Sequence, residues 1–416
     1  MAHWFHRNPL KATAPVGYEL KGVLSTQEAS KICSDLRFSR QKLLDFLTDA
    51  NNDLSGVENE FNNYLALMQG FLFSFDEKGG ESKLRNLVRY KWTNSMLGFT
   101  PTELSDTWFE LLNMCLNMAL WYSKHGAKVA GKDEVTEEEA KAIHRSMRKA
   151  AGLYSFVHKQ KGTIQEQAEP GSDLDQSVLS AYVAQSTAEA QEITVARAVE
   201  LKHAASLISA LSNETAKLFA EAEQSLSGLD AVLFDKWRKY LQLKYQFYLA
   251  YAYAYCGEAL LAEDKCGQAV RACREGIACY ERAEVLCKEY AKAKGAGTHA
   301  KPENHQFFKR IYPILKRHLD KAERENGFIY HQKVPDELPE LEMKATYGLV
   351  KPEEIELPPS SPLWNAKSYA AFNISKASVP DFSKAKKSEK ELPPVKEAPI
   401  YQTDKDHNSH SGCVIS

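Results

Sequence analysis

The sequence predicts a mostly α-helical protein with a tetratricopeptide-like helical core and minor extended or β segments near the N-terminus. Residues 185–219 hold no Gly and no Pro, and strong helix formers such as Ala, Glu and Leu fill much of this stretch. Two capping-box patterns, Ser25 with Glu28 and Thr136 with Glu139, mark the starts of further helices. Small residues also alternate with aromatic ones between residues 251 and 283, as in tetratricopeptide helix pairs.

The elements follow from these patterns in chain order. Residues 1–24 contain Pro9, Pro15 and Gly17 and are expected to be extended. Residues 84–96 are ambiguous, and the polar residues 160–174 are expected to form a loop. The predicted helices cover about residues 25–50, 57–75, 105–124, 137–156, 175–226, 230–262, 265–293 and 304–325. The helix over 175–226 is expected to be bent because of its length.

An apolar stripe runs along residues 204–219, where apolar positions recur at spacings of three and four. Leu207, Leu211 and Leu218 lie on one edge of the stripe, and Ile208 and Phe219 lie on the other. One edge can face the core while the other faces a partner, or the whole stripe can be buried. Periodicity alone favours complete burial, because apolar stripes are mostly core.

The predicted helices over 230–262 and 265–293 form a helical hairpin around residues 262–265. Small residues at Ala269, Ala272, Gly276 and Ala283 allow close packing against the aromatic run that begins at Tyr251. One such unit is convincing, and a regular array is not. An ordinary antiparallel helix pair remains the alternative.

Composition excludes several classes of protein. The formal net charge of the 416 residues is −2, which argues against a nucleic-acid binder that neutralises phosphates. No apolar run approaches the roughly 18–20 residues of a membrane helix. The N-terminal residues show no secretory signal, and Ala2 excludes N-myristoylation.

No motif argues for catalysis or for a metal site. The sequence contains no G-x-S-x-G, no Walker A and no H-E-x-x-H pattern. Five of the eight cysteines lie between Cys256 and Cys287, at spacings that match no zinc pattern, so we expect reduced, buried thiols. The acidic residues 137–139 fit the first turn of a helix better than a catalytic carboxylate pair. We therefore expect a protein without enzymatic activity and without a metal.

The chain ends in Cys413-Val-Ile-Ser416, a C-a-a-X box whose final Ser favours farnesylation. We expect a covalent farnesyl group on Cys413, no other cofactor, and removal of the last three residues. Residues 371–412 are rich in Pro, Lys and Ser and are expected to be disordered, which would make Cys413 accessible. One lipid gives only reversible membrane binding, so a second contact with the membrane or with a membrane-bound protein is expected.

Several stretches together resemble the BRO-domain, or Alix-like, family. The resemblance is carried by Trp4-Phe-His-Arg-Asn-Pro-Leu-Lys-Ala-Thr-Ala-Pro15, Ala188-Glu-Ala-Gln-Glu192, Gly327-Phe-Ile-Tyr-His-Gln-Lys-Val-Pro335, Lys344-Ala345 and Leu349-Val-Lys-Pro352. It covers about residues 1–370 and implies a curved, banana-shaped helical domain there. It also implies a partner, the C-terminal amphipathic helix of an ESCRT-III subunit of the charged multivesicular body protein type.

The resemblance also implies a set of partner-binding positions. Carried over position by position, they are Glu137, Lys141, Thr194, Leu207, Ala210 and Leu211. The resemblance thus implies that Leu207 and Leu211 lie on an exposed edge of the apolar stripe, while Ile208 and Phe219 face the core. Alix-like members carry an aromatic residue where this chain has Thr194 and a basic residue where it has Ala210. The first departure removes apolar area and the second removes a possible salt bridge. Tyr330 matches a family tyrosine, and a packing role is the simpler interpretation of it.

These observations predict a farnesylated adaptor at the cytosolic face of endosomal, nuclear-envelope or plasma membranes, with a cytosolic pool. It would bind ESCRT-III helices in membrane remodelling or repair, and it would bind no nucleic acid and no small-molecule substrate. The alternative is a prenylated scaffold that acts mainly through Pro-rich segments, around Leu357-Pro-Pro359 and Leu392-Pro-Pro-Val395.

Overall fold

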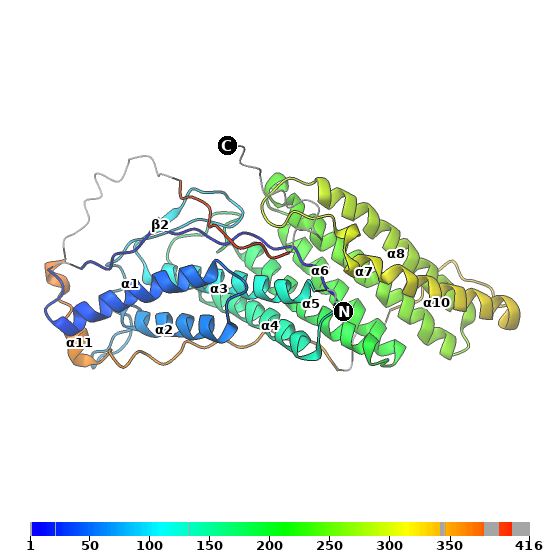
Figure 1. Cartoon of the computed structure of the whole chain (residues 1–416), viewed down its shortest axis with the longest axis horizontal. Helices are drawn as coiled ribbons and strands as arrows, with labels where there is room; N and C mark the ends of the chain where they lie inside the picture. Colours follow the sequence, from blue (N-terminus) through cyan, green and yellow to red (C-terminus); the bar gives the residue numbers. More distant parts are fainter. Residues whose placement is uncertain are drawn as a thin grey trace.

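The protein is an elongated, mostly helical molecule (Figure 1), and its computed structural model describes residues 2–20, 22–132, 134–341, 345, 347–377 and 391–401. The predicted fold class is confirmed. The α-helices are α1 (Gln27–Leu47), α2 (Leu54–Leu72), α3 (Thr107–Ala130), α4 (Glu137–Gln160), α5 (Gln176–Glu200), α6 (Ala205–Leu226), α7 (Ala231–Ala262), α8 (Cys266–Lys292), α9 (Gln306–Lys309), α10 (Ile311–Glu325) and α11 (Ala366–Ala370). Short 3₁₀ turns cover Lys161–Thr163, Pro302–Asn304 and Ile374–Lys376, and a π-helical turn covers Asn326–Tyr330.

A two-stranded antiparallel sheet interrupts the helices. Strand β1 (Tyr90–Trp92) pairs with β2 (Thr102–Leu104), and Lys91 lies opposite Glu103. Thr13 of the extended N-terminal stretch forms a bridge with Trp92. The minor β structure near the N-terminus is therefore confirmed, and it occupies part of the stretch that was ambiguous in sequence.

Each helix from α3 to α7 packs on the next helix in the chain, and α10 covers α7 and α8. Where the sequence predicted one bent helix over 175–226, the structure has two helices, α5 and α6, which pack side by side. The break lies at residues 201–204, where Lys202 adopts a left-handed φ of 54°. Neither Gly nor Pro marks this turn, so the sequence pattern missed it.

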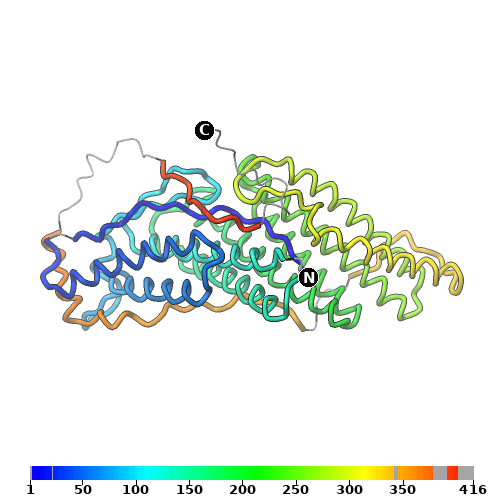
Figure 2. Tube along the Cα trace, viewed as in Figure 1, coloured from blue at the N-terminus to red at the C-terminus, as the bar shows by residue number. Residues whose placement is uncertain are grey.

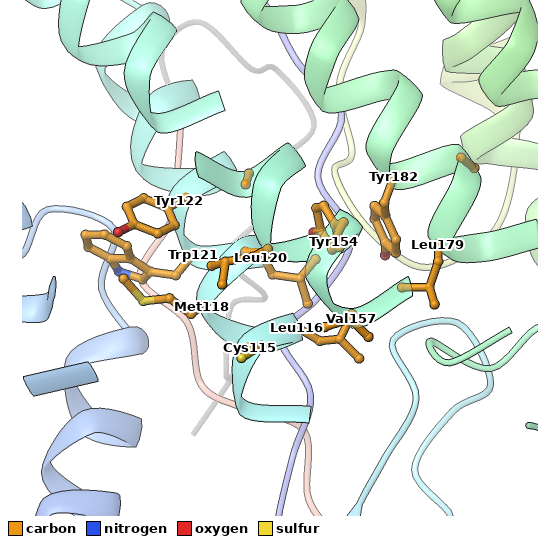
Figure 3. Close-up of a cluster of buried hydrophobic side chains, with 14 of the residues drawn as sticks. Cys115, Leu116, Met118, Leu120, Trp121, Tyr122, Tyr154, Val157, Leu179 and Tyr182 are labelled. Carbon is orange, nitrogen blue, oxygen red and sulfur yellow. The ribbon is translucent and has the colours of Figure 1, made fainter. Parts of the chain in front are cut away.

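The main hydrophobic core lies between these helices. Figure 3 shows Leu116 of α3, Val157 of α4 and Leu179 of α5 converging, and the rings of Tyr154 and Tyr182 stack with their centroids 4.4 Å apart. All five side chains are almost completely buried. Large apolar and aromatic side chains thus fix the spacing of α3, α4 and α5, and α4 and α5 carry several residues of the candidate site.

The α7–α8 hairpin packs as closely as the small residues predicted. A Cβ atom placed on Gly257 would lie 2.3 Å from Cys273 Sγ, and one placed on Gly276 would lie 3.1 Å from the carbonyl oxygen of Ala250. Any larger side chain at either position would push the two helices apart.

The N-terminal residues form a buried arm along the helices (Figure 2, dark blue). Trp4 and Phe5 are 1% and 0% exposed. Arg7 Nη1 donates to Glu189 Oε1 of α5 over 2.8 Å, and Lys244 Nζ of α7 donates to Glu192 Oε1 over 2.7 Å. Buried charges of this kind are tolerated only when they are paired, so the Arg7–Glu189 pair holds the arm on α5 and the Lys244–Glu192 pair holds α7 against α5.

After α10, the chain returns along the opposite side of the molecule as an extended segment (Figure 2, orange). Trp364 packs on α2, where its Nε1 donates to the carbonyl oxygen of Leu67 over 2.7 Å. Phe372 is completely buried and forms a bridge with Leu24. The ordered domain therefore continues past residue 370, the boundary that the sequence suggested.

Residues 391–401, which we call the docked segment, lie beside the N-terminal arm (Figure 2, red). The backbone N–H of Ala398 donates to the carbonyl oxygen of Thr48, and that of Leu392 donates to the carbonyl oxygen of Phe99. The expectation of disorder over 371–412 is therefore wrong for residues 371–377 and 391–401, because contacts distant in sequence hold both stretches. Cys413 and the rest of the C-a-a-X box lie outside the described residues.

Candidate functional site

Glu137 and Lys141 lie in the first two turns of α4. The capping box is present, since the Thr136 side chain accepts from the N–H of Glu139 and the Glu139 side chain accepts from the N–H of Thr136. Lys141 Nζ lies 3.0 Å from Glu137 Oε1, one helical turn away. The Glu137 and Lys141 side chains are 53% and 68% exposed. The capped helix end thus presents two opposite charges to solvent.

Arg197 connects this charged turn to α5. Its Nη2 lies 3.4 Å from Glu137 Oε2, and its Nη1 lies 3.1 Å from Glu200 Oε2. The Lys141 ammonium makes the largest contribution to a lowered pKa of Glu137, and the Arg197 guanidinium lowers this pKa further. Glu137 therefore stays ionised at neutral pH. Exposed ion pairs contribute little to stability, so these charges are available to a partner at small cost.

Thr194 and Leu211 meet beneath Gly348. Thr194 is half-buried on α5 and Leu211 lies on α6. A Cβ atom placed on Gly348 would lie 3.4 Å from Leu211 Cδ2 and 3.6 Å from Thr194 Cγ2. If one straight helix ran through both residues, Thr194 would point away from the edge that holds Leu207 and Leu211. The turn between α5 and α6 brings Thr194 and Leu211 together, because it folds α6 back against α5.

Residues 347–350, which we call the covering segment, are held over this point by Gln191. The Gln191 Nε2 donates to the carbonyl oxygen of Gly348 over 2.8 Å, and its Oε1 accepts from the N–H of Val350 over 2.8 Å. Gly348 has φ of +80°, which favours glycine. A single buried amide therefore fixes the path of the covering segment across α5.

The leucine edge of α6 is buried. Leu207, Ala210 and Leu211 are 8%, 0% and 1% exposed. The expectation that Leu207 and Leu211 form an exposed edge is wrong in this conformation, because Gly348 packs on Leu211. Ala210 lies in the main core and has no surface to offer to a partner.

The exposed apolar side chains at this point belong to the covering segment itself. Tyr347 and Leu349 flank Gly348 and are 60% and 46% exposed. Together with Thr194 and the charges of Glu137, Lys141 and Arg197, they form what we call the candidate surface. Of the six predicted positions, the structure places Glu137, Lys141 and Thr194 on this surface and places the three α6 residues beneath or behind it.

Sequence reasoning missed Arg197, Gln191 and the covering segment. Arg197 follows Thr194 by three residues and therefore shares its helix face, which is a signal the sequence did contain. The covering segment lies more than 150 residues from Gln191 in the chain, and no local pattern predicts that contact.

The cysteines that the structure describes lie in the packing of the domain. Burial raises the pKa of the Cys279 thiol to about 11, and the described cysteines are all buried. Among the described residues, no group of three or more His, Cys, Asp or Glu side chains is arranged to hold a metal ion. In the same part of the chain, no helix is long and apolar enough to cross a membrane.

Comparison with known proteins places this fold. The profile of the BRO1-like domain matches residues 13–382. The chain belongs to the BRO1-like domain family. It is 52% identical to the BRO1 domain-containing protein BROX homolog of Caenorhabditis elegans over 427 residues, with all of both chains covered. It is 49% identical to human BRO1 domain-containing protein BROX over 379 residues, which cover 90% of this chain and 92% of the human one.

Solved BRO1 domains share the fold at lower identity. The ALIX BRO1 domain in a complex with CHMP4C superposes with a TM-score of 0.66 at 18% identity, covering 88% of this chain and 99% of that one. A Bro1 domain solved to explain endosomal targeting superposes with a TM-score of 0.63 at 17% identity, covering 89% and 98%. The BRO1-like fold therefore extends over nearly all the described residues.

Proposed function

We propose that this chain is a non-enzymatic, farnesylated adaptor that binds the C-terminal helix of an ESCRT-III subunit through the candidate surface. The observation that carries the proposal is the BRO1-like scaffold with an exposed mixture of apolar and charged side chains on α4, α5 and the covering segment. A related scaffold forms a complex with CHMP4C in the ALIX BRO1 structure.

The chemistry of the surface suits an amphipathic helix. Tyr347 and Leu349 offer apolar area beside the half-buried Thr194, and helix-in-groove recognition relies on such contacts for most of its affinity. Lys141 and Arg197 can bind carboxylates of the partner, and Glu137 can bind one of its basic side chains. Thr194 fills less space than an aromatic residue, so we expect a shallower apolar site than in Alix-like members.

The first experiment is a calorimetric titration of the purified full chain with an ESCRT-III C-terminal helix peptide. We expect Leu349→Asp to weaken binding at least tenfold, about 1.4 kcal/mol, because it places a charge in the apolar part of the surface. Leu338→Asp is the matched control, since Leu338 is exposed to a similar extent, 41% against 46%. We expect the control to bind like the wild type.

A second pair of variants tests the charged part of the surface. Lys141→Glu breaks the ion pair with Glu137 and reverses a charge, so we expect severalfold weaker binding. Lys316→Glu is the control, because Lys316 makes the same kind of i,i+4 pair with Asp320 on α10. Wild-type affinity in both Leu349→Asp and Lys141→Glu would contradict the role of the candidate surface. Absence of binding by the wild type would contradict the proposed partner.

The lipid is the second part of the proposal. The Cys413-Val-Ile-Ser416 motif supports farnesylation, and a C15 isoprenoid would give reversible binding to bilayers. The partner would then supply the second membrane contact. Replacing Cys413 with Ser should move the protein from the membrane fraction to the cytosol in cells, and an unchanged distribution would contradict the lipid.

We place the adaptor on the cytosolic face of endosomal, nuclear-envelope or plasma membranes, where ESCRT-III acts in remodelling and repair. The scaffold alternative is less well supported. Val395 of the Leu392-Pro-Pro-Val395 stretch packs against the core, and the carbonyl oxygen of Pro358 accepts from Gln69 Nε2. Both Pro-rich stretches are thus engaged with the domain itself.

A further inference from the structure

The docked segment is held by charged and backbone contacts near its centre. Glu397 Oε2 lies 2.5 Å from Lys124 Nζ of α3, and Glu397 Oε1 accepts from the N–H of Leu10 over 2.7 Å. The Lys124 and Glu397 side chains are only 6% and 19% exposed. Lys128 Nζ donates to the carbonyl oxygen of Pro399 over 3.0 Å. A partly buried ion pair with these hydrogen bonds gives the segment a defined register on α3 and on the N-terminal arm.

Tyr401 fixes the end of the docked segment. Its hydroxyl donates to the carbonyl oxygen of Phe5 over 2.7 Å and accepts from the N–H of Phe5 over 2.8 Å. Its ring lies over Gly131, where a Cβ atom would come within 3.1 Å of it. The Tyr401 hydroxyl therefore forms two hydrogen bonds with the backbone of the arm, and its ring fills the space at the end of α3.

Tyr401 and the candidate surface share one small hydrophobic cluster. The cluster contains Phe5, Ile143 of α4 and Ile193 of α5, and both Val350 and Tyr401 pack against it. Ile143 follows Lys141 by two residues, Ile193 precedes Thr194, and Val350 ends the covering segment. The end of the docked segment thus lies on the same cluster that supports the candidate surface.

The docked segment also determines where the C-terminal residues leave the domain. Ala377 lies at the α1–α11 end of the molecule, where the carbonyl oxygen of Lys376 would be 3.5 Å from a Cβ atom on Gly22. Tyr401 lies instead beside Phe5, near the N-terminus at the middle of the molecule (Figures 1 and 2). Cys413 is 12 residues beyond Tyr401 and 36 residues beyond Ala377.

We propose that the docked segment sets the site of membrane attachment, so that a lipid on Cys413 holds the candidate surface close to the bilayer. This inference rests on the farnesyl group of the proposed function. Whatever their conformation, 12 residues span at most about 43 Å and 36 residues at most about 130 Å. With residues 391–401 docked, the bilayer therefore lies within about 43 Å of Tyr401. Without docking, the same lipid would hold the α1–α11 end of the domain, on a threefold longer tether.

The docking is tested on the full, unprenylated chain in solution by electron–electron distance measurement between two nitroxide labels. The described cysteines are buried, so label directed at thiols reacts at Cys413 and at an introduced Glu134→Cys on the exposed α3–α4 turn. With the wild-type docked segment, the distance is bounded by the sum of about 43 Å from Cys413 to Tyr401, the separation of Tyr401 from residue 134, and the label arms. The double variant Glu397→Ala/Tyr401→Ala should shift the distribution to longer and broader distances.

Two further variants keep this experiment decisive. Tyr401→Phe removes only the hydroxyl and should give a partial shift, while Lys396→Ala changes an exposed side chain of the segment and should leave the distances unchanged. Amide hydrogen exchange at Phe5 and Ala398 should accelerate in the double variant and not in Lys396→Ala. Identical distance distributions in the wild type and the double variant, with a folded circular dichroism spectrum, would overturn the docking.

The consequence for the membrane is tested by coupling Cys413 to vesicles that carry a maleimide lipid and a lipid-anchored ESCRT-III helix peptide. The effective concentration of the anchored peptide at the candidate surface falls roughly as the −3/2 power of tether length. The wild type should therefore bind the anchored peptide about fivefold better than the double variant. Both should bind the soluble peptide equally. Equal capture on vesicles would overturn the attachment geometry and leave the proposed function standing, whereas no binding of the soluble peptide by either would count against the proposed function alone.

Discussion

Burial of the N-terminal arm makes the stability of the protein depend on pH through His6. This side chain is 1% exposed, with Nε2 3.0 Å from Asn8 Oδ1 and Nδ1 2.9 Å from the Tyr290 hydroxyl. Burial lowers the pKa of His6 from 6.5 to about 3, which outweighs the opposing hydrogen bond to Asn8, and the charges of Lys236 and Arg7 act in the same direction as burial. The folded state therefore binds fewer protons than the unfolded state below pH 6.5. The stability that His6 contributes is complete above pH 6.5 and is lost as the pH falls toward 3.

The size of the effect follows from linkage. With a pKa of 6.5 in the unfolded state and about 3 in the folded state, protonation of His6 costs about 2 to 3 kcal/mol of the free energy of unfolding at pH 4.5 relative to pH 7.5. His6→Gln can donate to Asn8 Oδ1 without taking up a proton, so we expect this variant to lose less stability over the same pH interval by that amount.

The assay is urea unfolding at pH 7.5 and pH 4.5, followed by tryptophan fluorescence. The comparison uses the change in free energy of unfolding between the two pH values, so a constant cost of the substitution cancels. His203→Gln is the control, because His203 is exposed in the turn between α5 and α6. If the wild type and His6→Gln lose the same free energy between the two pH values, His6 titrates normally in the folded protein and the arm is not buried as described.

Two substitutions test how the extended segment that follows α10 packs on the helices. Gly70→Ala would bring a Cβ atom within 2.2 Å of the Trp364 ring, so we expect a loss of about 1 to 3 kcal/mol in urea unfolding. Gly228→Ala is its control, because a Cβ atom there meets nothing within 4 Å, and an equal loss in both would contradict the contact of Trp364 with α2. Leu211→Asp would bury an unpaired carboxylate, so its thermal unfolding midpoint should fall by several degrees. An unchanged midpoint in Leu211→Asp would mean that the covering segment does not pack on Leu211 in solution and that this side chain is exposed to solvent.

Local signals predicted most of the helices. Caps, the absence of Gly and Pro, and apolar periodicity placed α1, α2, α4, α7 and α8 to within a few residues. The turn between α5 and α6 escaped because its left-handed position is occupied by Lys202 rather than by Gly or Asn. Backbone hydrogen bonds of the turn and the packing of α6 on α5 stabilise that conformation, and no residue type in the turn indicates it.

The candidate surface was predictable in its charged half and not in its apolar half. Glu137 and Lys141 lie at a helix start that the capping box marks, and their i,i+4 spacing predicts the ion pair. The stripe of α6 predicted apolar area, but burial of Leu211 depends on Gly348, which comes from a segment far along the chain. The same limit applies to the docked segment, whose Pro- and Lys-rich composition is typical of disorder although Glu397 and Tyr401 find specific partners.

Substitutions at exposed residues of the candidate surface can test binding without disturbing the fold, whereas substitutions in α6 cannot. Leu207 and Leu211 belong to the main core, so any substitution that tests them as partner contacts also removes packing from α6. Lys141 and Leu349 are exposed, and their replacement leaves every helix–helix contact in place. The candidate surface is therefore built by the extended covering segment and by exposed charges on a helical scaffold. Under the proposed function, its affinity for a helical partner can change through the covering segment while the α3–α8 core stays the same.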